Sequence, residues 1–383
     1  MMMHAALTGA ASTSVGRLPD SSCKSLHLKA SQAAVADAGL SLNDIDGLLC
    51  AYSTTEPHMM LSSVMAEYMG IRPGFMSSVS MGGATAAILV MTAAALVQQG
   101  YCRHVLVVTG DNRLSGMGRA AQTMLAGGTL QQFEQPYGLS VPAAYALVAR
   151  RYMHEYGVTE EHLAAVAVTQ RHYAAAHPKA HFTAPLSMEQ ALAARYVASP
   201  LRLYDCCPVS DGAAAVIVSS AAAMRDGRAP GVRLLGAGQG HTHEHLVAAP
   251  SLTDFGCHQA AETAFARAGV RPDEIDVAQI YDSFTITLLV ELESMGFFER
   301  GEAGPAALAG ELGPSGRLPC NTHGGLLSYG HSGAAGGMFH IVEAVQQLRG
   351  QAGARQIDDA RLAFVHGDGG ILSAHCSLVL GRD

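Results

Sequence analysis

The chain of 383 residues contains no tryptophan, and only 15% of its residues are charged. An average soluble domain has about 25% charged residues, so this chain has few charges to place on an exposed surface. Lys and Arg form no run and the net charge is −8, which argues against a nucleic acid or an anionic membrane as the main partner. The 49% of hydrophobic residues exclude a disordered chain, because such chains have too few apolar side chains to form a core.

Long apolar segments and targeting segments are also missing. The longest mainly apolar run, residues 84–97, is shorter than the roughly 20 residues that span a bilayer. It predicts a buried helix instead. The first residues show no basic stretch followed by an apolar one, so we expect no secretory signal and a cytoplasmic location.

Disulfide and metal signatures are absent from the sequence. The eight cysteines are scattered without a Cys-x-x-Cys pair, which disfavours both a disulfide framework and a structural zinc site. The segment His241-Thr-His-Glu-His245 has histidines two residues apart that could chelate a metal. Because zinc signatures pair separated sets of ligands and no second set accompanies this segment, we expect no bound metal.

What the sequence does contain is internal repetition, together with 42 glycines. Residues 37–46 match residues 267–276 at Ala, Gly, Ile and Asp, and each copy follows a helical pattern and precedes an apolar strand. A second pair begins at Gly83 and Gly333, and each copy runs as a helix of equal length to a glycine and then to a strand. The order is the same in both halves, so we predict an internal duplication.

The alternation of apolar strands with helices predicts sheets that are covered on both faces. Two duplicated halves that share apolar central helices give a five-layer α/β/α/β/α arrangement. We expect an N-terminal half in residues 1–121 plus 199–230 and a C-terminal half in residues 231–383. Residues 122–198, which are polar and rich in histidine, are expected to form an inserted loop domain that could cover a site.

Four motifs spread along the chain resemble motifs of the thiolase superfamily. Residues 204–215 (YDCCPVSDGAAA) are similar to the thiolase segment that ends in Asp-Gly-Ala-Ala, and residues 279–284 (QIYDSF) to the His-Asp-Cys-Phe segment of the sterol-carrier-protein type thiolases. Residues 321–337 (NTHGGLLSYGHSGAAGG) resemble the C-terminal motif with its Gly-His-Pro turn, and residues 366–370 (HGDGG) stand where thiolases have Cys-x-Gly. The resemblance implies a thiolase fold.

The departures from the thiolase pattern bear on the reaction. Thiolases carry a nucleophilic cysteine at the start of the first buried helix, where the helix N-terminus lowers its pKa. Met81 stands at this place, and a thioether cannot form an acyl-enzyme. His366 replaces the second cysteine and Tyr281 replaces a substrate-side histidine, while a further tyrosine stands two residues before His331. Covalent Claisen chemistry is therefore not expected.

This set of changes resembles the thiolase-like lipid-transfer aldolases of steroid side-chain degradation. The resemblance implies the retro-aldol cleavage of a β-hydroxyacyl-CoA, such as the CoA thioester of a steroid side chain. It also implies a small partner protein that carries an OB-fold and a zinc ribbon, and we expect a homodimer. Coenzyme A enters as part of the substrate, and no other cofactor is expected.

A retro-aldol reaction needs a base for the β-hydroxyl proton, a donor for the enolate oxygen and an acid for the α-carbon. By the resemblance, Tyr281 and Tyr329 transfer protons and His331 binds the enolate oxygen, while His366 can move protons. An unperturbed tyrosine has a pKa near 10, so a base role requires a neighbour such as His331 or His366 to lower it. The predicted substrate-binding residues lie beside these groups or in the glycine turns, and they are Met81, Gly82, Gly83, Asp282, His323, Asp368, Gly369 and Gly370.

Two alternatives stay open on the sequence. One is a thiolase, an acetyl-CoA acyltransferase, that recruits a different cysteine such as Cys320. The other is a non-catalytic subunit that binds a lipid or an acyl-CoA. His331 within its glycine-rich frame argues against the second alternative, because a pure scaffold does not need it.

Overall fold

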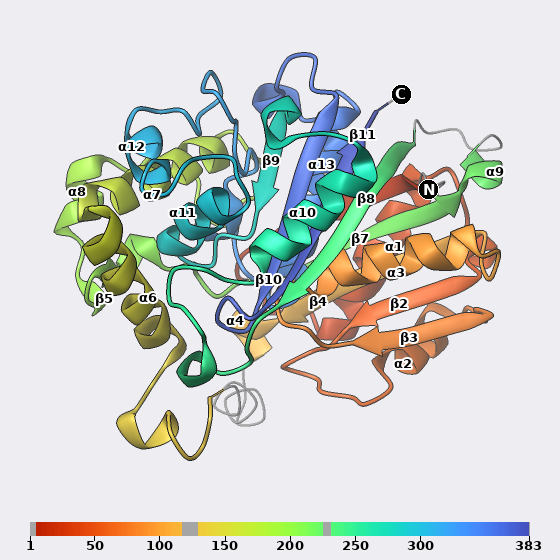
Figure 1. The fold of residues 1–383 in the computed structure, drawn as a ribbon. Coiled ribbons are helices and arrows are strands. Elements are labelled where there is room, and N and C mark those ends of the chain that lie inside the picture. The colour runs from red at the N-terminus through yellow and green to blue at the C-terminus, as the bar shows by residue number, and fades with distance from the viewer. Residues whose placement is uncertain (1–4, 117–128, 225–230, 383) are drawn as a thin grey trace.

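Nine strands form one mixed sheet in the computed structural model, which describes residues 5–116, 129–224 and 231–382 (Figure 1). The strands stand in the order β3-β2-β4-β7-β1-β8-β11-β10-β9. Their bounds are β1 Ala5–Ser12, β2 Gly47–Ala51, β3 Phe75–Val79, β4 His104–Asn112, β7 Asp211–Ser220, β8 Val232–His241, β9 Val277–Ile280, β10 Leu362–Gly369 and β11 Ala374–Gly381. A separate hairpin is formed by β5 (Tyr196–Ala198) and β6 (Leu201–Arg202).

Helices cover both faces of this sheet and extend from one side of it. Their bounds are α1 Cys23–Asp37, α2 Leu61–Met69, α3 Thr85–Gln98, α4 Arg113–Gly116, α6 Val141–Tyr156, α7 Glu160–Ala175, α8 Met188–Ala193, α9 Ala221–Met224, α10 Cys257–Ala268, α11 Thr285–Ser294, α12 Ala303–Leu308 and α13 Ala335–Leu348. Among the described residues, no helix combines the length and the apolar character that crossing a membrane requires.

The two halves of the sheet have the same topology. β2 and β4 are parallel, as are β9 and β10, and each pair is followed by two antiparallel neighbours. The outer strand β3 has its counterpart in a single bridge between Ala278 and Cys320. Among the described strands, the two halves are joined by β1 and β8, where Ala6 pairs with Arg233 and Leu7 with Val232. The nine strands therefore form one continuous sheet rather than the two separate sheets that the sequence suggested.

The aspartate that ends the first sequence repeat makes equivalent hydrogen bonds in both halves. Asp46, at the start of β2, accepts hydrogen bonds from the amides of Arg103 and His104 at the start of β4. Asp276, before β9, accepts from the amides of Arg361 and Leu362 at the start of β10. Each aspartate therefore ties the starts of two parallel strands together.

The second repeat forms the central helices. α3 and α13 contact each other and strands of both halves, and one hydrophobic cluster includes both helices and the strands on either side. α1 covers the outer face of the first half, on β1, β4 and β7, and α10 covers β8 and β11 of the second. The layers are therefore α1, first half, α3 with α13, second half and α10, which agrees with the predicted five layers and the predicted buried helix.

Five helices gather at one side of the molecule. α6, α7 and α8 come from the segment between β4 and β7; α6 and α7 contact α11, α7 also contacts α12, and α8 contacts α7 (Figure 1). The predicted boundaries at residues 121/122 and 230/231 lie outside the described residues. The division into two halves with an inserted loop domain stays a prediction.

Candidate active site

Two glycine turns from opposite halves of the chain touch each other. Met81, Gly82 and Gly83 lead into α3, and the end of β10 leads through Gly369 to Gly370. A Cβ atom on Gly82 would lie 2.6 Å from Cα of Gly369, and one on Gly369 would lie 2.2 Å from the carbonyl oxygen of Met81. Five of the predicted substrate-binding residues therefore lie together, and their contact requires glycine.

Tyr281 lies directly against these turns. It follows β9, and its amide donates a hydrogen bond to the carbonyl of His366 on β10 (3.1 Å). A Cβ atom on Gly83 would lie 2.1 Å from Cζ of the Tyr281 ring, and the ring also faces Gly336 at the start of α13. The absence of a side chain at Gly83 thus makes the space in which the tyrosine ring lies.

The Tyr281 hydroxyl and His331 form the central polar pair of this region. The hydroxyl oxygen lies 2.7 Å from Nε2 of His331, and Nη1 of Arg113 lies 3.4 Å from Nδ1 of the same ring. Because a guanidinium only donates hydrogen bonds, Nδ1 is the acceptor and Nε2 carries the hydrogen. His331 therefore donates to the Tyr281 oxygen, and the Tyr281 proton is left to point at another acceptor.

Burial keeps both members of this pair neutral. It lowers the pKa of His331 to about 3, and the charge of Arg113 acts in the same direction. It raises the pKa of Tyr281 well above its usual value. The condition for a base role at Tyr281, a neighbour that lowers its pKa, is therefore not met, because burial outweighs the nearby charge of Arg113. A protonated Tyr281 is suited to act as an acid.

Tyr329 and His331 are separated in space although they are two residues apart. Tyr329 is the last residue of a π-helical turn (Gly325–Tyr329), and its hydroxyl lies 3.0 Å from the Ser12 hydroxyl. Gly330, with φ of +127°, turns the backbone between the two side chains. Tyr329 is buried against His323, with ring centroids 4.9 Å apart. A proton-transfer role for Tyr329 stays a prediction.

Asp282 and His323, both predicted to bind substrate, are buried behind the site. Asp282 accepts a hydrogen bond from the Leu326 amide (2.7 Å), and burial raises the pKa of its carboxyl group well above the usual value. His323 has no hydrogen-bond partner among the described residues, and its ring packs against that of His340. In this arrangement Asp282 holds the π-helical turn rather than facing an open cavity.

The side chains of His366 and Asp368 form hydrogen bonds with residues other than Tyr281 and His331. Nδ1 of His366 lies 2.8 Å from the Ser377 hydroxyl, and Asp368 accepts a hydrogen bond from the Tyr145 hydroxyl (2.9 Å). Both side chains are buried. The backbone of Asp368 does contribute to the site, because its carbonyl oxygen would lie 2.3 Å from a Cβ atom on Gly83.

The thiolase profiles cover most of this chain. The N-terminal domain of thiolase matches residues 2–222, and the thiolase C-terminal domain-like profile matches residues 238–382. The chain belongs to the thiolase family. The predicted family and fold are confirmed, and the matched ranges include Met81, Tyr281 and His331.

Similar proteins of this family include enzymes of two kinds. The steroid side-chain-cleaving aldolase of Thermomonospora curvata is 35% identical over 398 residues, which cover 99% of this chain and 98% of that protein. The acetyl-CoA acetyltransferase of Methanothermobacter thermautotrophicus is 32% identical over 383 residues, which cover 98% and 99%. The solved structure of the Ltp2-ChsH2(DUF35) aldolase matches with a TM-score of 0.89 at 35% identity, covering 100% of this chain and 98% of that one. The prediction of an enzyme is confirmed.

The cysteines of this thiolase-family chain are all free, and none is suited to nucleophilic attack. Burial raises the pKa of every one of the eight thiols. Cys320, the cysteine considered as an alternative nucleophile, is completely buried. Because the thiolate is the nucleophile, the structure disfavours an acyl-enzyme on Cys320.

The histidines of the 241–245 segment do not converge. His241 Nδ1 lies 3.1 Å from the carbonyl oxygen of Ser373, and His243 Nε2 lies 3.1 Å from that of Ile371. The two rings therefore fasten the loop between β10 and β11 to the end of β8. These hydrogen bonds account for His241 and His243, and the absence of a metal at this segment stays a prediction.

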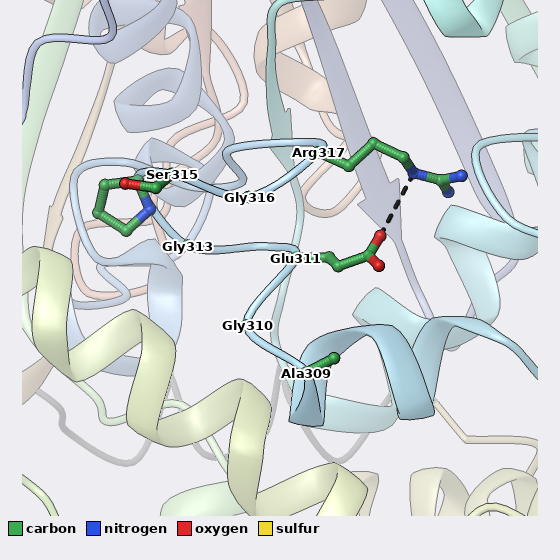
Figure 2. Close-up of a pocket in the computed structure, with 8 residues that line it drawn as sticks. Ala309, Gly310, Glu311, Gly313, Ser315, Gly316 and Arg317 are labelled. Atoms are coloured by element: carbon green, nitrogen blue, oxygen red, sulfur yellow. Dashed lines mark ion pairs between the residues drawn. The ribbon is translucent and has the colours of Figure 1, made fainter.

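Several residues of the region carry no motif that sequence reasoning could have found. Arg113 reaches His331 from the end of β4, and Tyr145 reaches Asp368 from α6. A surface hollow of about 540 Å³ lies elsewhere, around residues 309–317, where Glu311 and Arg317 form an ion pair (Figure 2). Its lining includes none of the predicted site residues, so we assign it no part in the reaction.

Proposed function

We propose that this enzyme cleaves a carbon–carbon bond of a β-hydroxyacyl-CoA by a retro-aldol reaction, without an acyl-enzyme. One observation carries the proposal: a neutral Tyr281–His331 pair, 2.7 Å apart, lies against the turn where Met81 holds the place of the thiolase nucleophile. Phenol and imidazole groups move protons and bind developing charge, which is what this reaction requires. A thioether supplies neither a nucleophile nor a proton.

The reaction transfers one proton from the β-hydroxyl oxygen to the α-carbon. When the base removes the hydroxyl proton, the oxygen forms a carbonyl, the bond between the α- and β-carbons breaks, and its electron pair enters the thioester enolate. Tyr281 then protonates the α-carbon, because its proton points away from His331. Donation from Nε2 of His331 stabilises the phenolate that remains on Tyr281 until the hydroxyl proton replaces it. Burial raises the pKa of Tyr329, so Tyr329 is retained as the second proposed proton-transfer group, which relays a proton as a neutral phenol. The single Nε2–H of His331 donates to the enolate oxygen while the enolate exists, and to the Tyr281 oxygen once the phenolate has formed.

The proposed substrate carries its acyl group as a CoA thioester, with the side chain of a steroid as the candidate acyl group. The similarity to the steroid side-chain-cleaving aldolase supports the acyl group. The similarity to the Ltp2-ChsH2(DUF35) aldolase supports a small partner protein, for which we propose an OB-fold and a zinc ribbon. We further propose that the enzyme is a cytoplasmic homodimer.

The decisive experiment follows cleavage of a steroidal β-hydroxyacyl-CoA by the full chain, co-expressed with its small partner. Tyr281→Phe and His331→Ala should each lower kcat/KM by about 10³-fold, the range for a lost proton-transfer group. Tyr137→Phe is the matched control, because the Tyr137 side chain is 87% exposed and should leave the rate unchanged. Full activity in both site variants would contradict the assignment.

Thiolysis is the second candidate function, favoured by the similarity to the archaeal acetyl-CoA acetyltransferase. The same preparation, given acetoacetyl-CoA and free CoA, should form no acetyl-CoA above the uncatalysed rate. Formation of acetyl-CoA that iodoacetamide abolishes would replace the aldolase proposal with a thiolase. Binding of acyl-CoA without turnover of either substrate would indicate a non-catalytic subunit.

A further inference from the structure

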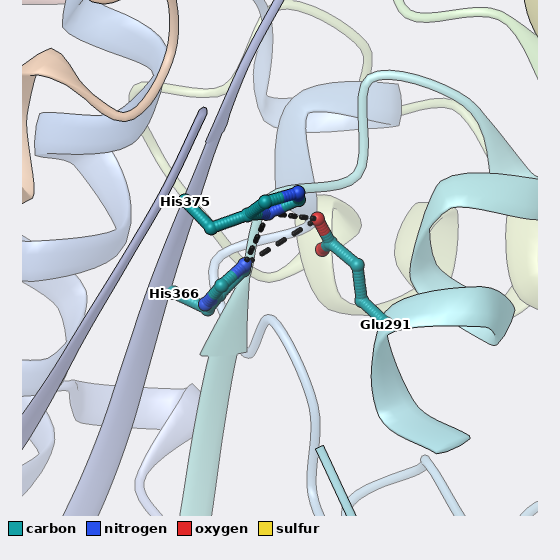
Figure 3. Close-up of side chains that lie close together, drawn as sticks. All are labelled: Glu291, His366 and His375. Atoms are coloured by element: carbon teal, nitrogen blue, oxygen red, sulfur yellow. Dashed lines mark hydrogen bonds and ion pairs between the residues drawn. The ribbon is translucent and has the colours of Figure 1, made fainter. Parts of the chain in front are cut away.

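Three buried side chains meet inside the second half, outside the Tyr281–His331 pair. Glu291 comes from α11, His366 from β10 and His375 from β11 (Figure 3). In the hairpin, His366 pairs with Ser377 and Asp368 with His375, so both histidines lie on one face, where Glu291 approaches them. All three side chains have an exposed fraction of 0%. Glu291 is far in the sequence from the two histidines of the hairpin, which is why no motif predicted the cluster.

The three side chains leave hydrogen-bonding capacity unused. Among the described residues, the two carboxylate oxygens of Glu291 have no hydrogen-bond partner. The same is true of Nε2 of His375. A polar group that is buried without a partner costs several kcal/mol, and a charged one costs more. A cation between the three side chains would remove this cost for the Glu291 carboxylate, and the facing nitrogens, Nε2 of His366 and Nδ1 of His375, would donate electron pairs to it.

The distances within the cluster fit a tetrahedral metal ion. Nε2 of His366 lies 3.1 Å from Nδ1 of His375 and 3.5 Å from Oε1 of Glu291, and the third edge is 3.9 Å. Bonds of about 2.0–2.2 Å at tetrahedral angles place neighbouring ligand atoms roughly 3.4 Å apart. We propose that Glu291, His366 and His375 bind a divalent transition-metal ion of the zinc class.

The surroundings supply further support for such a site. The Ser377 hydroxyl lies 2.8 Å from Nδ1 of His366 and orients the ring, as partners of metal-binding histidines do. Oδ1 of Asp368 lies 4.0 Å from Nδ1 of His375 and has no hydrogen-bond partner among the described residues, so it is the candidate fourth ligand. Two imidazoles with carboxylates select zinc or a neighbouring transition metal over magnesium or calcium, which prefer oxygen ligands alone.

Complete burial makes this a structural ion rather than one that binds substrate, since catalytic zinc sites keep an open position. The ion would tie α11 to the β10–β11 hairpin. The end of β10 carries Gly369, which touches Met81 of the opposite turn. The ion would therefore fix the position of a turn at the active site without entering the reaction, and its existence does not depend on the proposed cleavage.

Metal analysis of the full chain tests the site. The chain is purified without its partner, because a zinc ribbon there would add metal of its own, and it is refolded with Zn²⁺ and dialysed. Wild type should hold about one equivalent of zinc. Glu291→Gln and His375→Gln should hold at least about tenfold less. The matched control is His243→Gln, which removes a buried histidine bonded to the carbonyl of Ile371 in the same loop and should keep the ion.

A spectroscopic measurement keeps the test independent of variants that fail to fold. Wild type refolded with Co²⁺ should show the intense visible absorption of a tetrahedral site, and added Zn²⁺ should remove it. Wild type that holds less than about 0.1 equivalent after refolding would overturn the proposal. So would zinc retained at the wild-type level in both Glu291→Gln and His375→Gln. Either result would mean that the 3.1 Å distance between Nε2 of His366 and Nδ1 of His375 reflects a direct hydrogen bond and not a shared metal ion.

Discussion

The two halves of the sheet have one topology but contribute differently to the active site. The first half supplies a turn, Met81 to Gly83, that offers backbone and space but no proton-transfer group. The second half supplies Tyr281 and His331, and the Glu291 cluster lies within it. The two halves therefore share one strand arrangement, while the Tyr281–His331 pair and the Glu291 cluster lie in the second half. The missing nucleophile is thus part of a wider division between the halves.

Gly83→Ala should have the largest effect among the tests of this division. The new methyl group would lie 2.1 Å from the Tyr281 ring, so the ring must move, and a shift of about 1 Å at a reacting group can cost about 10²-fold in rate. Crowding should also lower the free energy of unfolding by about 1–3 kcal/mol. Both are measured, by cleavage kinetics and urea unfolding.

Gly100→Ala is the control for this substitution. Gly100 ends the same repeat copy that begins at Gly83. It has φ of +74°, and a Cβ atom there meets nothing within 4 Å. Gly100→Ala should lower the free energy of unfolding by about 1 kcal/mol, because alanine disfavours the positive φ, and it should leave kcat/KM unchanged. Equal losses of activity in the two variants would show that Gly83 has no special relation to Tyr281.

Acid should destabilise the protein through buried histidines of the second half. Burial lowers the pKa of His340 to about 3, whereas an unfolded histidine has a pKa near 6.5. Between these values the unfolded chain binds more protons, so the free energy of unfolding falls as the pH falls from 7 towards 3. For one such histidine the loss at pH 5 is about 2 kcal/mol.

When the pH falls from 7.5 to 5, the free energy of unfolding should therefore decrease by about 2 kcal/mol less in His340→Gln than in wild type. Urea unfolding at both pH values gives the two differences. His58→Gln, which changes an exposed histidine of the first half, should follow wild type. Parallel curves for wild type and His340→Gln would show that His340 titrates normally in the folded protein.

Asp46 and Asp276, the aspartates of the first repeat, should contribute equally to the free energy of unfolding. Asp46→Ala and Asp276→Ala each leave two strand amides without their acceptor, and each should cost about 1 kcal/mol. The two sites have no shared partner, so the double variant should show the sum of the single losses in urea unfolding. A loss in only one half would mean that the repeat keeps its role on one side only.

Alkylation of the native cysteines should have no effect on the cleavage activity, which makes it the smallest effect among these tests. Burial raises the pKa of all eight thiols, for example that of Cys102 to about 11, so iodoacetamide at pH 7 should leave cleavage activity unchanged. Met81→Cys places a thiol at a position that is 36% exposed and should be labelled readily, as mass spectrometry would show. Rapid inactivation of wild type would mean that a native thiol takes part in the reaction.

Much of the frame could be predicted because it depends on local patterns. The glycine-to-glycine repeats mark α3 and α13, and the touching turns at Met81 and Gly369 follow from the glycine clusters. The matched aspartates could be found as repeated letters, although their bonds to the strand amides appear only in the structure.

The rest of the site depends on contacts between distant segments. Arg113 and the cluster of Glu291, His366 and His375 come from separate elements, so no spacing reveals them. The positions of Tyr329 and His331 could not be predicted from their separation of two residues, because Gly330 redirects the backbone between them. The direction of the Tyr281 pKa shift also follows from burial, which a motif does not contain.

The place of β1 in the sheet sets the order in which the chain can fold during synthesis. β1 (Ala5–Ser12) is made first, yet its neighbours are β7 (Asp211–Ser220) and β8 (Val232–His241). The first strand must therefore wait until more than half of the chain has left the ribosome before either edge can pair. Such distant pairings slow folding, and in the meantime an apolar strand with two open edges is the segment that a chaperone would need to cover.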